Sequence, residues 1–340
     1  MLQPIITLFL TLPFDHSQQL FLVSLYNLVK FTSPAFIFGI VFTVIRKNDQ
    51  QAKLPLKSYF SDQWDNNFFP TFAWTLFYLI AMPNLQQHGH FHNIATFIWQ
   101  FFSDNATPHL WYSVMMLQFL LIMPGIKSVC NWVQHSYRRL LIAVISSGII
   151  YFAWLIFYDH FILNGPEATH WYLLDRIFIS FLIFGLYGGL SWNFHHEIQT
   201  FLFTYWWLIV GFYLLTYFRT RDLFLATFKL TDLTNDSYYL PSMAIYALAV
   251  IFLIYLICIA QKVFMAKINS FSSFLCLSSI FSQCFWDRIF WQYFNFKQLA
   301  LQNIYLAVLL LCICTWCASY LSVYVIHQLW LKINGSVGPS

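Results

Sequence analysis

Long apolar runs alternate with short polar segments along the whole chain. A helix that crosses a membrane needs about 20 consecutive, predominantly apolar residues, because the hydrocarbon layer is about 30 Å thick. Runs near this length are bounded here by Pro, Gly or clusters of charged residues, which end helices or form loops. The pattern predicts nine complete transmembrane helices, over Leu20–Ile45, Phe68–Pro83, Leu110–Ile126, Leu140–Tyr158, Trp171–Trp192, Phe201–Phe218, Tyr238–Ala260, Ile268–Phe285 and Leu299–His327.

A further apolar segment, Leu2–Phe14, is too short to cross the same layer at a rise of about 1.5 Å per residue. It has neither the basic region nor the small-residue cleavage site of a secretory signal peptide. We expect it to be the end of a membrane helix that begins upstream of Met1. The predicted fold is therefore all-α: a polytopic membrane protein of about ten transmembrane helices, the first incomplete, forming a single integral-membrane domain over residues 1–340.

Composition supports this class and excludes several others. Of the 340 residues, 59% are hydrophobic and 21% aromatic, whereas only 9% are charged. Because a soluble domain carries about 25% charged residues, this chain cannot cover a water-facing surface of its size. Disordered, collagen-like and nucleic-acid-binding classes fail for the same reason. The expected partner is the lipid bilayer, and no nucleic acid is expected.

The lysines and arginines are unevenly divided between the predicted loops. If Leu2–Phe14 leads out of the membrane, the smaller set of basic residues lies outside: Arg176, Arg219, Arg221, Lys229, Arg288 and Lys297. The larger set lies inside, at Arg46, Lys47, Lys53, Lys57, Lys127, Arg138, Arg139, Lys262, Lys267 and Lys332. Since cytoplasmic loops carry an excess of Lys and Arg, we expect a plasma-membrane protein with a cytoplasmic C-terminus.

Metal binding is not expected. The seven cysteines lie mostly within apolar runs, where small buried residues are typical, and they show no disulfide framework. Only Cys312, Cys314 and Cys317, on one predicted helix, hint weakly at a metal. His88, His90 and His92 alternate in a predicted loop, where solvated histidines are the more common interpretation. The sequence therefore predicts no metal site.

Polar residues inside apolar runs carry the functional hypotheses, because polar groups at membrane depth are costly. Lys30 is either a lysine that is paired or extends to the interface, or a cation that faces a substrate cavity. Gln118 either bonds a neighbouring helix or belongs to a site. Arg176 is either half of an interfacial ion pair or a site residue. His109, at the start of an apolar run, is either an interfacial histidine or an acid or base.

The segment His109–Pro124 carries a family resemblance. Its His-Leu-Trp-Tyr-Ser start, its Gln118 seven residues after Trp111, and its closing proline resemble one helix of the acyltransferase-3 family. Other stretches are similar to further family helices in the same order, at 31–38, 46–70, 178–189 and 271–279. The spacing and aromatic character are most similar to the branch that acylates poly-N-acetylglucosamine-type exopolysaccharides.

The resemblance implies a membrane O-acyltransferase. Such enzymes move an acetyl, succinyl or similar acyl group from a cytoplasmic thioester, such as acyl-CoA, to a hydroxyl of a cell-surface glycan or exopolysaccharide. No tightly bound cofactor is expected, and polysaccharide synthesis machinery is an expected partner. The resemblance implies three catalytic candidates, His109, Gln118 and Arg176. It implies that the substrate is bound by Lys30, Trp111 and Tyr112. It implies that the acyl donor is bound by Lys53 and Lys57.

The chain departs from the family pattern at three places. The family's essential histidine lies in the first helix, of which only Leu2–Phe14 is present. Residues 63–67 replace the arginines usual before the third helix, and Ser279 stands where a histidine is typical. Two alternatives therefore stay open: a transporter or flippase for polysaccharide or lipid-linked glycan, and a catalytically inactive family member that acts as a membrane scaffold.

Overall fold

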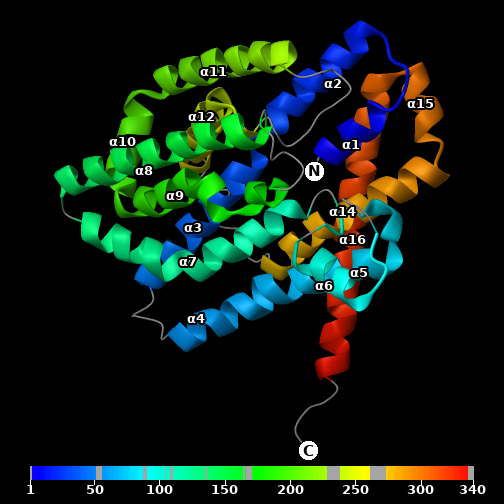
Figure 1. Cartoon of the computed structure of the whole chain (residues 1–340), viewed down its shortest axis with the longest axis horizontal. Helices are drawn as coiled ribbons and strands as arrows, with labels where there is room; N and C mark the ends of the chain where they lie inside the picture. The colour runs from blue at the N-terminus through cyan, green and yellow to red at the C-terminus, as the bar shows by residue number, and fades with distance from the viewer. Residues whose placement is uncertain are drawn as a thin grey trace, which may run out of the picture. The chain divides into compact units, whose positions relative to one another are not determined.

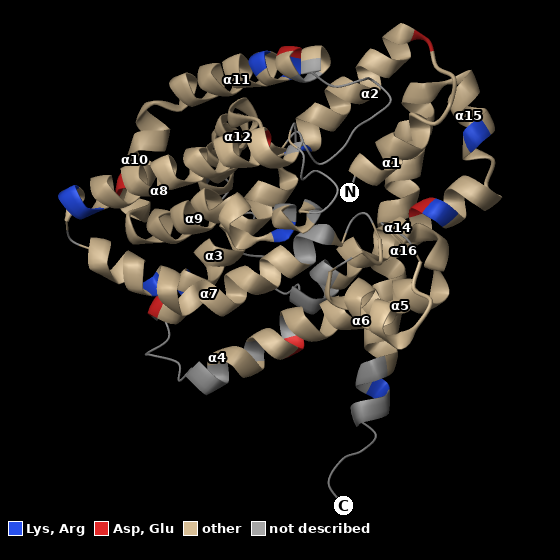
Figure 2. Ribbon diagram, in the orientation of Figure 1, with Lys and Arg blue, Asp and Glu red and all other residues tan. Residues whose placement is uncertain are grey.

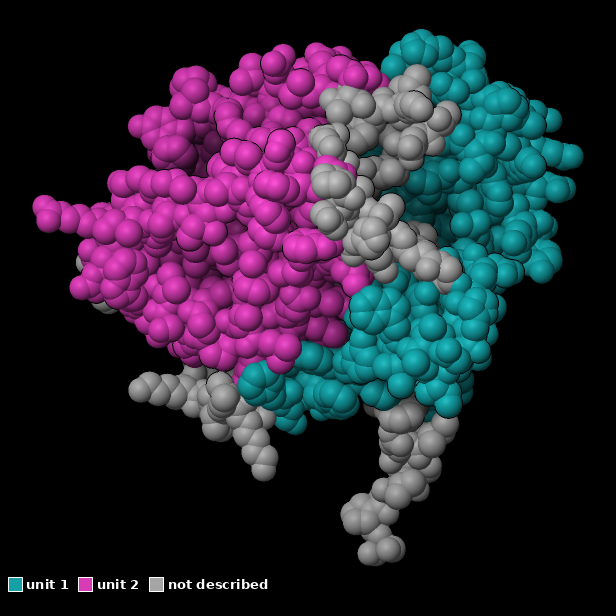
Figure 3. Space-filling model, viewed as in Figure 1, with its two compact units in different colours: residues 1–26, 60–111, 268–340 teal, residues 27–59, 112–267 magenta. Residues whose placement is uncertain are grey.

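The structure is a computed structural model that describes residues 2–50, 56–86, 90–103, 105–107, 110–134, 136–163, 165, 171–227, 238–260 and 273–335. Helix accounts for 89% of it, and the described residues form no strand (Figure 1). The all-α prediction is confirmed. The chain divides into two compact units, residues 1–26, 60–111 and 268–340 in the first, and residues 27–59 and 112–267 in the second (Figure 3).

Unit 1 is built on two long helices, α14 (Ser273–Tyr293) and α16 (Ile304–Gly335), which pack against each other. Helices α1 (Leu2–Phe9) and α5 (Phe69–Ala81) both pack on α14. The remaining elements of this unit are most of α2 (His16–Val29), a π-helical turn η1 (Trp64–Phe68), a 3₁₀ turn η2 (Pro83–Leu85), α6 (Ile94–Phe102) and α15 (Phe296–Gln302).

A tyrosine joins α5 to α14 inside unit 1. The fully buried Tyr78 donates a hydrogen bond from its hydroxyl to the Phe281 carbonyl at 2.6 Å. The same hydroxyl accepts a hydrogen bond from the Phe285 amide at 3.1 Å. Both backbone groups belong to one turn of α14, so the phenol fixes the register of α5 on that helix.

Replacement of Tyr78 by phenylalanine is expected to lower the free energy of unfolding by about 2 kcal/mol, because both buried hydrogen bonds are lost together. Denaturant unfolding of the purified protein in detergent measures the change. Tyr293→Phe is the matched control, since Tyr293 is the exposed last residue of α14. Equal stability of Y78F and wild type would show that the phenol does not hold the two helices.

Unit 2 contains two closely packed helix pairs. Helix α3 (Thr32–Gln50) packs along α9 (Leu182–Asn193), and α11 (Trp206–Thr227) packs along α12 (Pro241–Ala260). The other elements of this unit are α4 (Leu56–Gln63, which ends in unit 1), α7 (Trp111–Val133), α8 (Tyr137–Tyr158), a π-helical turn η3 (Asp159–Leu163), two 3₁₀ turns η4 (Tyr172–Arg176) and η5 (Phe178–Phe181), and α10 (His195–Thr204).

Glycine allows α3 and α9 to approach closely. A Cβ atom at Gly188 on α9 would lie 2.4 Å from the Phe38 carbonyl oxygen of α3. At Gly185, one turn earlier, a Cβ atom would lie 2.3 Å from the Phe119 ring of α7. Small residues at such spacing let helix backbones pack closely within membranes.

In the described part of the chain, five helical stretches are long and apolar enough to cross a membrane. They are His16–Asp49, which joins α2 and α3 across the break at Lys30 and Phe31, and Val114–Val133, Tyr137–Ile162, Pro241–Ile259 and Ile304–Leu329. A sixth candidate is the pair His195–Thr204 and Trp206–Leu223, bent by 82°. Large apolar side chains on these helices are exposed, such as Ile149 at 65% and Leu215 at 67%. In unit 2 the charged residues gather mainly at helix ends (Figure 2). These features confirm a membrane protein whose apolar surface suits a lipid bilayer.

Several predicted spans differ from the observed helices. The predicted spans Phe201–Phe218 and Leu299–His327 are interrupted at Tyr205 and at Asn303. The predicted helix Leu20–Ile45 is interrupted between Val29 and Thr32. The run Trp171–Trp192 is not one helix, because it begins with the two short turns η4 and η5. The helix predicted to end at Phe285 continues to Tyr293.

Candidate functional site

A break between α2 and α3 places Lys30 between two helices. Pro34 lies in the first turn of α3. In an unbroken helix its ring would clash with the carbonyl of the residue four positions earlier, which is Lys30. The chain therefore leaves the helix at Lys30 and Phe31, and Pro34 occupies a position where a backbone N–H is not needed. The neighbouring Leu28 carbonyl accepts a hydrogen bond from the Tyr246 hydroxyl at 3.1 Å.

The Lys30 side chain is buried, at 1% exposure. Its Nζ atom lies 4.1 Å from the centre of the Tyr238 ring, which also is buried. A cation over an aromatic face is attracted by the ring quadrupole, and more strongly so when water is excluded. The Tyr238 hydroxyl and the Ser33 hydroxyl lie 3.2 Å apart and share a hydrogen bond. The position of Lys30 is therefore fixed inside unit 2.

A side-chain amide holds the irregular segment that contains Arg176. Gln118 of α7 donates from Nε2 to the Arg176 carbonyl at 2.9 Å and accepts at Oε1 from the Phe178 amide at 2.9 Å. Nearby, the Ser180 hydroxyl donates to the Leu174 carbonyl at 3.1 Å. Gln118 thus satisfies backbone groups that a continuous helix would have paired, and it permits the break between η4 and η5.

Replacement of Gln118 by glutamate is expected to destabilise the protein by about 2 kcal/mol, because a carboxylate cannot donate to the Arg176 carbonyl. Thermal unfolding in detergent measures the effect. Gln134→Glu is the control, because Gln134 is exposed and directly follows the last residue of α7. If Q118E unfolds at the temperature of wild type, the amide does not support this turn.

A ring contact connects these two regions of unit 2. The Phe181 and Tyr238 rings meet edge to face, with centroids 5.6 Å apart. We call Lys30, Arg176, Gln118, Phe181 and Tyr238 the buried basic site. Arg176 is 5% exposed, and the charged side chains among the described buried residues of unit 2 are these two cations. Buried cations can bind an anionic group or stabilise negative charge that develops on a carbonyl oxygen during acyl transfer.

The structure places some of the predicted site residues and omits others. It brings Gln118 and Arg176 together, and it buries Lys30 in the same unit. Gln118 bonds backbone at both ends of its amide, so it positions the Arg176 segment. Trp111 and Tyr112 begin α7, and Lys57 lies in α4, but the side chains of these three residues are outside the described part of the chain. His109 and Lys53 lie outside it entirely.

Sequence reasoning missed one residue of the buried basic site and one buried acidic residue elsewhere. Tyr238 was only the first residue of a predicted helix, and nothing in the sequence indicated its contact with Lys30. Asp287 lies two residues beyond the predicted helix end at Phe285, yet it is 1% exposed within α14 of unit 1. Neither of its carboxylate oxygens has a hydrogen-bond partner among the described residues. The continuation of apolar and aromatic residues from Phe285 to Tyr293 was the available signal.

Metal-ligating side chains do not gather in the described residues, which contain no group of three or more His, Cys, Asp or Glu suited to an ion. The described cysteines are free. On α16, Cys312 and Cys314 are partly buried and Cys317 is exposed. Comparison of the chain with protein-family models, curated proteins and solved structures found no match.

Proposed function

We propose that this protein is a membrane acyltransferase that moves an acetyl, succinyl or similar acyl group from a thioester to a hydroxyl of a cell-surface glycan. The observation that supports this function best is the buried basic site. Lys30, at 1% exposure, lies over Tyr238, and Arg176 is supplied by a segment that Gln118 holds. Two buried cations suit a reaction whose transition state carries negative charge on the acyl oxygen.

In the proposed reaction the acceptor hydroxyl attacks the thioester carbonyl. A C–O bond forms, the C–S bond breaks, and the hydroxyl proton passes through a base to the departing thiolate. Lys30 and Arg176 stabilise the oxyanion, and Gln118 acts as a positioning residue. His109 is the base that the sequence suggests. Trp111 and Tyr112 are proposed to contact the faces of the sugar rings. Lys53 and Lys57 are proposed to contact the phosphates of the acyl donor.

The proposal includes a finer topology. We infer about ten transmembrane helices, a plasma-membrane location and a cytoplasmic C-terminus, which would expose the donor side to cytoplasmic acyl-CoA. The helices that qualify as spans and the exposed apolar residues support the membrane location in general. The excess of Lys and Arg in one set of predicted loops supports the orientation.

Complementation of a deletion strain tests the activity. Cell-surface glycan is isolated from the deletion strain with and without the chain, and ester-linked acyl groups per sugar are counted by mass spectrometry before and after mild alkali. The proposal predicts alkali-labile acyl groups that depend on the chain. An unchanged acyl content at normal protein abundance would refute it.

A second candidate function is a transporter or flippase for a polysaccharide or lipid-linked glycan. The observation that favours it is the pair of interrupted helices, at Lys30 and at the 82° bend near Tyr205, because transporters use broken helices at their substrate sites. This function predicts that deletion lowers the amount of exported glycan and leaves the acyl content of each sugar unchanged. The complementation experiment therefore separates the two functions.

A further inference from the structure

One side of α16 is buried inside unit 1. Its buried positions recur every fourth residue, so they form a row along the helix: Ala307, Leu311, Thr315, Ser319 and Val323, each at most 3% exposed. Helix α14 packs closely against α16 (Figure 1). The indole of Trp286 on α14 donates to the Ser322 hydroxyl of α16 at 3.1 Å. The row is therefore apolar except at Thr315 and Ser319, which lie one turn apart.

An acidic residue of α14 meets this polar part of the row. Asp287 is 1% exposed, and the Thr315 side chain faces its carboxylate across the two helices. The contact falls short of a hydrogen bond, because both carboxylate oxygens and the Thr315 hydroxyl lack a hydrogen-bond partner among the described residues. The Ser319 hydroxyl lacks one as well. Four buried oxygen atoms, two of a carboxylate and two of hydroxyl groups, are thus without partners here.

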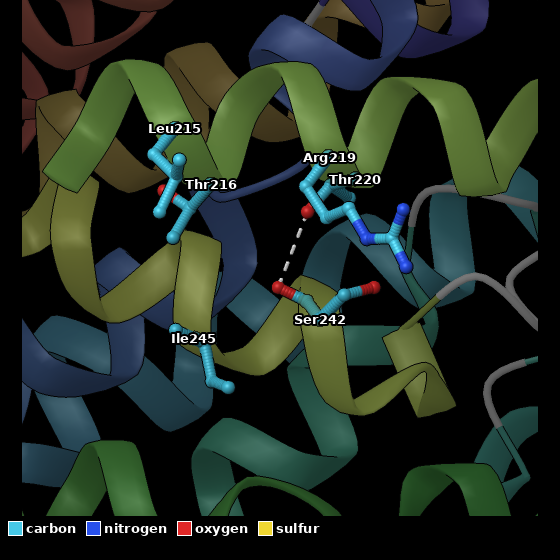
Figure 4. A pocket seen from close by; sticks show the side chains of 6 residues that line it. All are labelled: Leu215, Thr216, Arg219, Thr220, Ser242 and Ile245. Atoms are coloured by element: carbon cyan, nitrogen blue, oxygen red, sulfur yellow. Dashed lines mark hydrogen bonds between the residues drawn. The ribbon is translucent and has the colours of Figure 1, made fainter.

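Hydroxyl groups on other helices of this chain bond to backbone carbonyls. Thr75, buried on α5, donates to the Thr71 carbonyl at 2.9 Å. In unit 2, Thr220 of α11 donates to the Ser242 carbonyl of α12 at 3.2 Å, as the dashed line in Figure 4 shows. Threonine and serine inside helices commonly bond to a carbonyl in this way. Thr315 and Ser319 do not, so their oxygen atoms are available to a ligand between α14 and α16.

The charge of Asp287 is not balanced by an ion pair among the described residues. Arg288 follows it in α14, but neighbouring residues of a helix do not face the same side. The thiols of Cys284 and Cys312, which also lie near the carboxylate, are neutral groups. Because a buried carboxylate is costly unless it is paired, this position favours a positively charged ligand.

We propose that Asp287, Thr315 and Ser319 bind a monovalent metal cation, which holds α14 against α16. Carboxylate and hydroxyl oxygens suit hard cations, whereas transition metals prefer nitrogen and sulfur ligands. One carboxylate neutralises one positive charge, so a divalent ion would leave a net charge buried. A proton would bond to one carboxylate oxygen, whereas a metal cation contacts several oxygens together. This site is independent of the proposed acyl transfer, whose buried residues belong to unit 2.

Thermal unfolding of the full chain, purified in a neutral detergent, tests the site. The probes are sodium, potassium and calcium chloride, each compared with choline chloride at the same ionic strength. A cation that binds only the folded protein raises Tm in proportion to its occupancy. We expect sodium or potassium to raise the Tm of wild type above its value in choline. Calcium is expected to act only at higher concentration than the better monovalent ion.

Two variants address the proposed ligands. D287N should make Tm insensitive to the cations, because loss of the one negative charge weakens binding at least about 100-fold. T315V keeps the shape of the side chain and removes one oxygen ligand, so about 10-fold more cation should be needed for half of the stabilisation. Circular dichroism confirms that each variant is folded.

Matched controls make the test specific. T75V removes a buried hydroxyl of unit 1 that bonds to backbone, and R288Q removes the neighbouring charge. Both should respond to the cation as wild type does. The proposal would be overturned if wild type gave the same Tm in all four salts, if D287N kept the wild-type response, if T315V and T75V behaved alike, or if calcium acted at the lowest concentration. A wild-type Tm that depends on Asp287 through pH alone would assign the site to a proton and also overturn it.

Discussion

Replacement of Lys30 by methionine is expected to lower acyl transfer at least about 100-fold, because removal of one preorganised group that stabilises an oxyanion typically costs this much. Methionine keeps the length of the side chain and removes its charge. Lys30 is 1% exposed and its Nζ atom lies 4.1 Å from the Tyr238 ring centre, so solvent cannot replace the lost cation. The measurement is the number of acyl groups per sugar in the complemented strain.

Two controls separate this effect from misfolding. Lys47→Met removes a cation from the exposed end of α3 and should leave acylation unchanged. Lys30→Arg keeps the charge but presents a planar guanidinium, so partial activity is expected. Acylation by K30M at the wild-type level, with normal abundance and thermal stability, would remove Lys30 from the proposed chemistry.

Replacement of Gly188 by alanine is expected to cost about 3 kcal/mol of stability, the upper part of the range for overpacked cores. The new methyl group would lie 2.4 Å from the Phe38 carbonyl oxygen. That oxygen belongs to backbone, so the clash is relieved only if α3 and α9 separate. Denaturant unfolding in detergent, together with protein abundance in membranes, measures the loss.

Gly39, one residue after Phe38 on α3, provides the matched control. A Cβ atom at Gly39 meets nothing within 4 Å. Gly39→Ala should therefore be neutral or stabilise by up to about 1 kcal/mol, since alanine favours helix over glycine. If G188A and G39A behaved alike, close backbone approach at Phe38 would not explain the α3–α9 packing.

The helices of this protein are predictable from sequence, whereas their interruptions are not. Apolar run length identified α7, α8, α12 and α16, because lipid and core positions both require apolar residues. The break at Lys30 depends on Pro34, which is visible in the sequence. The break after Arg176 depends on Gln118, about sixty positions away, and only the fold brings those residues together.

The candidate site was predictable to a similar extent. Lys30, Gln118 and Arg176 stand out in sequence because they are polar residues next to or within apolar runs. Their roles were not evident from the sequence. The Gln118 amide hydrogen-bonds to backbone groups of the Arg176 segment. Lys30 contacts Tyr238, a residue with no distinguishing sequence pattern. Asp287 lies beyond the predicted helix end because hydropathy falls near Phe285, although helix α14 and its burial extend further.

Transfer of a labelled acyl group by the purified protein tests the central claim most directly. Wild-type, K30M and K47M proteins are placed in vesicles at equal amounts with radiolabelled acetyl-CoA and a soluble β-1,6-linked N-acetylglucosamine oligomer, and alkali-labile label on the oligomer is counted over time. The account predicts steady transfer by wild type and K47M, and a rate at least about 100-fold lower for K30M. Equal transfer by K30M and wild type would contradict the account, as would no transfer by any of the three proteins under conditions in which wild type restores acylation in cells.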